Sequence, residues 1–109
     1  MSLIARLKAI EESLTRQGPE ASGVLKGIID DLRASGAADL AQGVGDEAPA
    51  FRLEGTEGDW IELDALVARR PVVLTFFRGN WCPYCTAEMD ALNRTYREIL
   101  DFGADLVAI

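Results

Sequence analysis

Residues 72 to 85 read VVLTFFRGNWCPYC, and this stretch decides the fold of the chain. Its first six residues are nearly all apolar and β-prone, which predicts a strand that is buried on both faces. RGNWCPYC follows at once, and an amphipathic helix is predicted to run from Cys82 to Leu100. The last residues, DLVAI (105–109), predict a second buried strand. Parallel strands joined by one helix form a βαβ unit, so the C-terminal half is predicted to be α/β.

The only two cysteines of the chain, Cys82 and Cys85, lie at the start of this predicted helix. Helix N-termini carry unpaired N–H groups and about half a positive charge, so the pKa of a thiol at Cys82 is expected to fall. Pro83 suits the first turn because its missing N–H costs nothing there. Since Cys85 follows three residues later, both sulfur atoms should lie on one side of the turn and could form a disulfide. We therefore predict a redox pair in which Cys82, the more exposed thiol, attacks the substrate and Cys85 resolves the mixed disulfide.

Other interpretations of these residues stay open. Two buried, inert thiols are the structural alternative, and a four-thiolate metal site shared by two chains is another. The chain has no histidine, which excludes a Cys–His hydrolase and a His-containing zinc site within one chain. Trp81 could shield the pair and offer a surface to partner proteins, or it could be a core residue. Arg78 could add positive charge, or it could be a solvated loop residue.

The first 42 residues predict a helical extension. Apolar residues recur at a helical period from Leu3 to Leu14, and again from Val24 to Leu32, with Gly18-Pro19 between the two helices. The loop GVGDEAPAF (43–51) marks the boundary, so we expect a helical extension at 1–42 and a second part at 43–109. There, alternation on both sides of GTEG (55–58) predicts a hairpin, and Asp64 is predicted to cap a short helix that Pro71 ends.

Composition limits the class of protein. The net charge is −7, and residues 46–109 hold 12 acids against 6 bases, so no basic face for nucleic acid is evident. The first residues lack the apolar segment and cleavage site of a signal peptide, and no stretch is apolar for the roughly 18 residues of a membrane span. We therefore expect a cytoplasmic protein that binds neither nucleic acid nor membranes.

WCPYC, placed after a buried strand and opening a helix, resembles the thioredoxin-fold oxidoreductases. Residues 45–53, GDEAPAFRL, resemble the first strand of the alkyl hydroperoxide reductase/thiol-specific antioxidant (AhpC/TSA) family, and FFRGNWCPYCTAEMDAL is similar to a peroxiredoxin-like, CxxC-containing branch of it. The resemblance covers residues 43–109. It implies a thioredoxin-like fold, reduction of peroxides or disulfides with electrons from a thiol donor such as thioredoxin or glutathione, and no metal or organic cofactor.

The chain also departs from the pattern of that family. Peroxiredoxins usually have a threonine or serine three residues before the cysteine that attacks peroxide, and alignment on that spacing makes Cys85 the attacking residue and leaves Cys82 at the hydroxyl position. CPYC is also a glutaredoxin motif, but glutaredoxins carry it near their start. The chain ends at Ile109, before the second half of a thioredoxin fold, so apolar surface and strand edges should be exposed. Two explanations are open: the chain is a fragment of a longer protein, or it pairs with another copy to close its sheet. We expect self-association, most simply as a homodimer.

These observations predict a thiol-dependent oxidoreductase with a peroxiredoxin-like activity. The first alternative is a disulfide reductase of the thioredoxin or glutaredoxin type. An alternative of another class is a truncated, catalytically inactive module that associates with itself.

Overall fold

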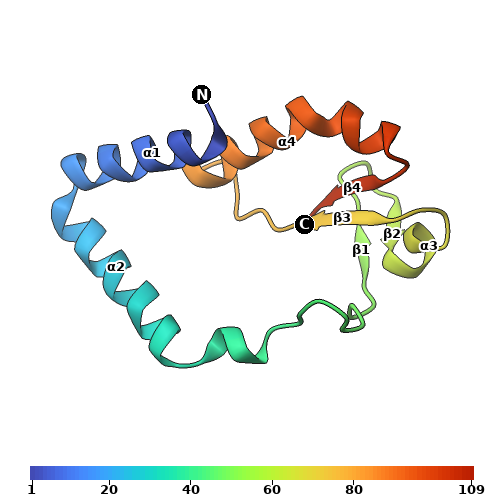
Figure 1. Cartoon of the computed structure of the whole chain (residues 1–109), viewed down its shortest axis with the longest axis horizontal. Coiled ribbons are helices and arrows are strands. Elements are labelled where there is room, and N and C mark those ends of the chain that lie inside the picture. The colour runs from blue at the N-terminus through green and yellow to red at the C-terminus, as the bar shows by residue number, and fades with distance from the viewer. The chain divides into compact units, whose positions relative to one another are not determined.

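The computed structural model describes residues 1–109, which divide into two compact units, Met1–Ala48 and Pro49–Ile109 (Figure 1). The first unit contains the helices α1 (Leu3–Gln17) and α2 (Pro19–Ala34) and the short 3₁₀-helix η1 (Ala37–Leu40). The hydroxyl of Ser2 caps α1 by accepting a hydrogen bond from the amide of Ala5 at 3.2 Å. The two helices predicted on either side of Gly18-Pro19 are therefore confirmed.

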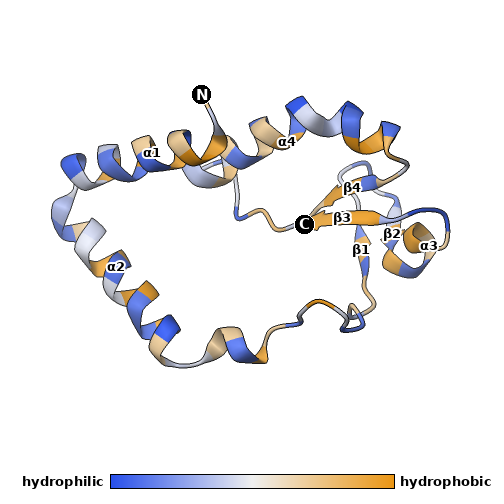
Figure 2. Ribbon diagram, in the orientation of Figure 1, coloured by the Kyte–Doolittle hydropathy of each residue, from blue (hydrophilic) through white to orange (hydrophobic).

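The helices of this unit have no buried side chain. Both long helices carry an apolar stripe along a polar background (Figure 2). The stripe of α2 is solvent-exposed, and it consists of Val24, Leu25, Ile28, Ile29 and Leu32. The helix is held to α1 by a hydrogen bond between the hydroxyls of Thr15 and Ser22, which lie 3.0 Å apart.

The second unit opens with the predicted hairpin. Strand β1 (Arg52–Glu54) pairs antiparallel with β2 (Trp60–Glu62), with Arg52 opposite Glu62. Their side chains form a 2.9 Å ion pair, and the Arg52 guanidinium lies over the Trp60 ring at 4.3 Å. These cross-strand contacts fix the register of the hairpin.

Helix α3 (Leu63–Val67) follows β2 directly, and here the sequence interpretation of Asp64 was wrong. The N-cap residue is Glu62, and no side chain caps the helix. Asp64 lies inside the first turn instead, because Leu63 already has helical geometry and turns its side chain into the core. The amide of Leu63 donates to the carbonyl of Phe51 at 3.1 Å, which ties the start of α3 to the residue before β1.

Strand β3 (Val72–Thr75), helix α4 (Pro83–Asp101) and strand β4 (Asp105–Ala108) form the predicted βαβ unit. The strands are parallel, with Val72 opposite Asp105 and Thr75 opposite Ala108. This confirms a mixed α/β architecture consistent with part of a thioredoxin-like fold. Both strands end beside each other, and α4 returns the chain between them (Figure 1).

The prediction of a six-residue strand buried on both faces was wrong. Strand β3 stops at Thr75, its residue Val73 is 41% exposed, and the next residue, Phe76, is 72% exposed. The reason is that this sheet has only two strands, so part of its apolar surface has no neighbour to cover it. The amide of Phe77 still donates to the carbonyl of Ile109 at 2.6 Å, which continues the pairing beyond the strands.

None of the helices combines the length and the apolar character that crossing a lipid bilayer requires.

Candidate functional site

The two cysteines lie where the sequence predicted, at the first turn of α4. Pro83 is the first helical residue, and Cys82 is the N-cap with an extended backbone. The amide of Cys82 donates to the carbonyl of Gly79 at 3.0 Å, which closes the turn that leads into the helix. Both the amide and the hydroxyl of Thr86 donate to the carbonyl of Cys82 at 3.1 Å. The loop and the helix therefore hold the backbone of Cys82 from both sides.

Sequence reasoning missed the role of Thr86. Its hydroxyl is bonded four residues back, a local pattern that threonine often forms within helices. The sequence does carry a signal for this hydrogen bond, since Thr86 follows Cys82 by four residues within the predicted helix.

The exposure of the two thiols differs from the prediction. Cys82 was expected to be the more exposed, but it is 3% exposed and Cys85 is 8% exposed. The cause is the extended backbone at the helix start, along which successive side chains alternate in direction. Trp81 and Pro83 point to solvent, so Cys82 between them points inward. Both residues are free thiols.

The pKa of the Cys82 thiol is lowered from its ordinary value. The largest cause is the backbone amide of Cys85, followed by the side-chain thiol of Cys85, which lies within hydrogen-bonding reach. The amide of Tyr84 and the charge of Arg78 add smaller contributions, and burial opposes all of them. The amides of Tyr84 and Cys85 are the orphan N–H groups of the second and third helical positions.

The geometry of these amides shows how they act. No well-formed capping hydrogen bond joins them to the Cys82 side chain. We therefore attribute their effect to dipoles that point at the sulfur, rather than to two complete hydrogen bonds. The result is a site that favours a thiolate at Cys82 without a histidine or another general base.

Cys85 is tied to the loop before the helix. Its sulfur accepts a hydrogen bond from the backbone amide of Arg78 at 3.4 Å. The Cys85 thiol also lies within reach of Cys82. Cys85 therefore links the loop before the helix to Cys82. The two sulfur atoms are thus neighbours on one side of the first turn, as the spacing predicted.

The side chain of Trp81 is 70% exposed, so its interpretation as a core residue was wrong. The indole packs against Gly79, which has φ +151°, and a side-chain carbon at that position would overlap the ring. The Arg78 guanidinium lies over the Trp81 ring, 4.9 Å from the ring centroid. Gly79 is therefore needed both for its backbone angle and for the close approach of the indole.

A pocket of about 540 Å³ adjoins the start of α4. Asn80 and Thr86, which flank the cysteine pair, supply polar groups to its lining, and Phe77, Met89 and Ile109 supply apolar surface. Such a mixed lining is typical of sites that hold an organic molecule or a peptide segment. Neither cysteine forms part of a group of three or more potential metal ligands.

The lowered pKa leads to a prediction about pH. A lowered pKa means that the thiolate persists to lower pH, so alkylation of Cys82 by iodoacetamide should reach half its maximal rate at a lower pH than alkylation of an unstructured cysteine peptide. Cys85→Ala should move this midpoint upward but not to the peptide value, because the backbone amide, the largest cause, remains. Mass spectrometry of the modified residue measures both midpoints. Equal midpoints for the protein and the peptide would contradict the electrostatic assignment.

Comparison with known proteins identifies related sequences. The model of the AhpC/TSA family matches residues 44–109. The chain is 36% identical over 66 residues to the thiol-disulfide oxidoreductase ResA of Bacillus anthracis, covering 61% of this chain and 37% of that protein. It is 37% identical over 65 residues to ResA of Bacillus subtilis, covering 60% and 35% of the two chains. It is 38% identical over 53 residues to the thiol:disulfide interchange protein DsbE of Escherichia coli, covering 47% and 28%.

The chain thus spans little more than a third of the length of the ResA proteins and 28% of the length of DsbE. No solved structure matches it significantly. The family model nevertheless covers more than half of the chain, including the hairpin, both parallel strands and the cysteine pair. The chain therefore belongs to the AhpC/TSA family.

Proposed function

We propose that the protein is a thiol–disulfide oxidoreductase that works through Cys82 and Cys85. The observation that carries the proposal is the position of Cys82 at the N-cap of α4 with the Cys85 thiol within reach of it, an arrangement that lowers the pKa of Cys82. The names of the matched relatives, thiol-disulfide oxidoreductase and thiol:disulfide interchange protein, support the same chemistry.

The proposed reaction has two steps. The Cys82 thiolate attacks one sulfur of a substrate disulfide, so that a bond forms between protein and substrate and one substrate thiolate leaves. Cys85 then gives its proton to the first substrate thiolate and attacks the sulfur of Cys82, which releases the second substrate thiolate and leaves a Cys82–Cys85 disulfide; solvent protonates that second thiolate. The substrate disulfide gains two electrons and the protein dithiol loses two. A small thiol donor or a dithiol protein of the thioredoxin type then reduces the protein disulfide again.

Burial is part of this proposal. Cys82 is buried, and burial raises its pKa less than the amides and the second thiol lower it. Because Cys82 is 3% exposed, a substrate sulfur can reach it only if the side chains that cover it move aside. Rotation of an exposed side chain is fast compared with enzymatic turnover.

Peroxide reduction is the finer form of the proposal, and membership of the AhpC/TSA family supports it. The thiolate would attack one peroxide oxygen, forming a sulfenic acid while the other oxygen leaves as water or an alcohol. The second thiol would then attack the sulfenic sulfur, forming the disulfide and releasing water. In this reaction too, a thiol donor would restore the dithiol.

The experiment compares two substrates under one electron donor. The protein with dithiothreitol should reduce the disulfides of insulin well above the background rate, since the site lowers the pKa of its thiol. Consumption of hydrogen peroxide measured beside it tests the finer proposal. Activity towards insulin alone would support the disulfide reductase and exclude the peroxidase. Activity that survives the combined change Cys82→Ser and Cys85→Ser would contradict both.

Self-association is proposed as well, with a second copy of the chain as the partner. The exposed apolar stripe of α2 and the edges of the two-stranded sheet support it. Light scattering at micromolar concentration should then give the mass of a dimer, and the mass of a monomer would contradict it. We propose the cytoplasm as the location, which cell fractionation tests.

A further inference from the structure

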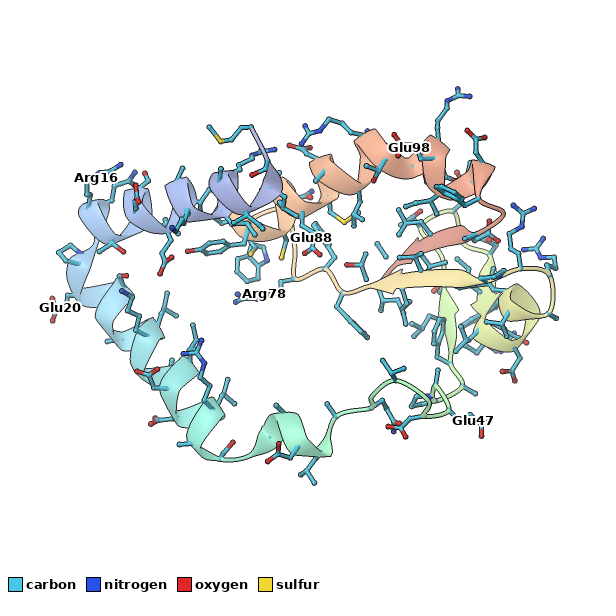
Figure 3. The ribbon with its side chains drawn as sticks, viewed as in Figure 1. Arg16, Glu20, Glu47, Arg78, Glu88 and Glu98 are labelled. Atoms are coloured by element: carbon cyan, nitrogen blue, oxygen red, sulfur yellow. The ribbon has the colours of Figure 1, made fainter.

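One charged side chain at the cysteine site takes no direct part in the bond changes of the reaction described above. Arg78 lies in the loop before α4, and its side chain is solvent-exposed (Figure 3). Its backbone amide holds Cys85, while its guanidinium lies over the ring of Trp81 at 4.9 Å. The same guanidinium is close enough to Cys82 to act on it electrostatically. Arg78 is thus held at the backbone by Cys85 and at the tip of its side chain by Trp81.

The hydrogen-bonding capacity of this guanidinium is unused. Arg78 forms no salt bridge, in contrast to Arg52 and Arg70, which pair with Glu62 and Asp105. Glu88 lies in the second turn of α4, but no ion pair joins it to Arg78 (Figure 3). In a stack on an aromatic ring, a guanidinium uses its face and keeps its N–H edges for other partners. Those edges match the two oxygens of a carboxylate.

The net charge of the whole chain is negative, opposite in sign to the charge of Arg78. A net charge of −7 disfavours anions in general, so any preference for an anion at this site must come from a local cation. Arg78 is that cation, since it is the positive charge that acts on Cys82.

We propose that Arg78 is a specificity-determining residue, which favours disulfide substrates that carry a carboxylate close to the sulfur atom attacked by Cys82. The inference rests on the proposed function, because only a reacting Cys82 can express the preference. The carboxylate would bind the N–H edges of the guanidinium while the substrate sulfur meets the sulfur of Cys82. The chemical step and its electron balance are those of the dithiol–disulfide exchange given above.

The test uses three small disulfides that differ in charge: dithiodipropionate with two carboxylates, bis(2-hydroxyethyl) disulfide with none, and cystamine with two ammonium groups. The reduced protein is mixed with each, and formation of the protein disulfide is followed by acid quench and mass spectrometry. The result is the ratio of the rate constants for the anionic and cationic reagents. The thiolate fraction of Cys82 affects both rate constants equally and therefore cancels in this ratio.

Arg78→Gln should lower the ratio by about tenfold at low salt, since it removes a unit charge that attracts one reagent and repels the other. Arg78→Lys keeps the charge but lacks the planar guanidinium, so its ratio of rate constants should lie between those of Arg78→Gln and wild type. Raising the salt concentration to about 0.5 M should reduce the ratio for wild type much more than for Arg78→Gln.

Arg69→Gln is the matched control. Arg69 is exposed, forms no salt bridge and lies before β3, at the other end of the strand from the cysteines. Arg69→Gln changes the net charge by the same amount as Arg78→Gln. Its ratio of anionic to cationic rate constants should equal that of wild type. Equal ratios for Arg78→Gln and Arg69→Gln would overturn the inference while leaving the proposed function intact. If none of the three disulfides oxidises the reduced protein, the proposed function and this inference fail together.

Discussion

Cys82→Ser is expected to lower the rate of insulin reduction by at least about a hundredfold, because a serine hydroxyl stays protonated where the cysteine forms a thiolate. The backbone amides that lower the pKa of Cys82 remain in this variant, but they have no thiolate to stabilise. The measurement is the turbidity assay of insulin with dithiothreitol. Circular dichroism and the urea midpoint show whether the variant is folded, which separates loss of chemistry from loss of structure.

Cys85→Ser should have a different outcome. Cys82 can still attack a disulfide, but no second thiol is present to release the product, so the mixed disulfide between Cys82 and the substrate should accumulate. Non-reducing electrophoresis and mass spectrometry detect this species. If the mixed disulfide instead accumulates in Cys82→Ser, then Cys85 is the attacking thiol, as alignment with the peroxidatic cysteine implies. The two single variants together therefore assign the order of attack.

Leu63→Ala is expected to lower the free energy of unfolding by about 2–3 kcal/mol. Leu63 is 6% exposed and belongs to a small buried set in which the other members are Cys82, Cys85 and Ala87. It lies where the hairpin passes into α3, so its removal leaves a cavity between these elements. Urea denaturation measures the change, and the slope of the transition should stay the same if only the native state is affected.

Val67→Ala is the control for this change. Val67 ends the same helix α3 but is 52% exposed, so its truncation should alter the stability by no more than about 0.5 kcal/mol. The pH midpoint for alkylation of Cys82 should be unchanged in both variants, since neither residue contributes to the lowered pKa. Equal losses for the two variants would show that Leu63 is not part of the core.

The local pattern of the sequence predicts most of the secondary structure. Gly18-Pro19 separates two helices, the turn residues 55–58 join two strands, and Pro83 opens α4, because each of these residues restricts the backbone whatever surrounds it. The same pattern predicts the parallel pairing of β3 and β4, since two apolar segments joined by one helix allow few other arrangements. For the site, the sequence predicts the helix N-terminus at Cys82 and the neighbouring sulfur of Cys85.

Tertiary structure decided what depends on side-chain direction and on neighbours distant in sequence. The exposed faces of Val73 and Phe76 follow from a sheet of only two strands, and residue types do not reveal how many strands cover a segment. The inward turn of Cys82 and the stack of Arg78 on Trp81 follow from the backbone angles of a short loop closed on Gly79. Sequence alone therefore determined that the two thiols lie together at the start of a helix. The fold decided which charges, amides and rings surround them, because those contacts depend on loop angles that no periodic pattern encodes.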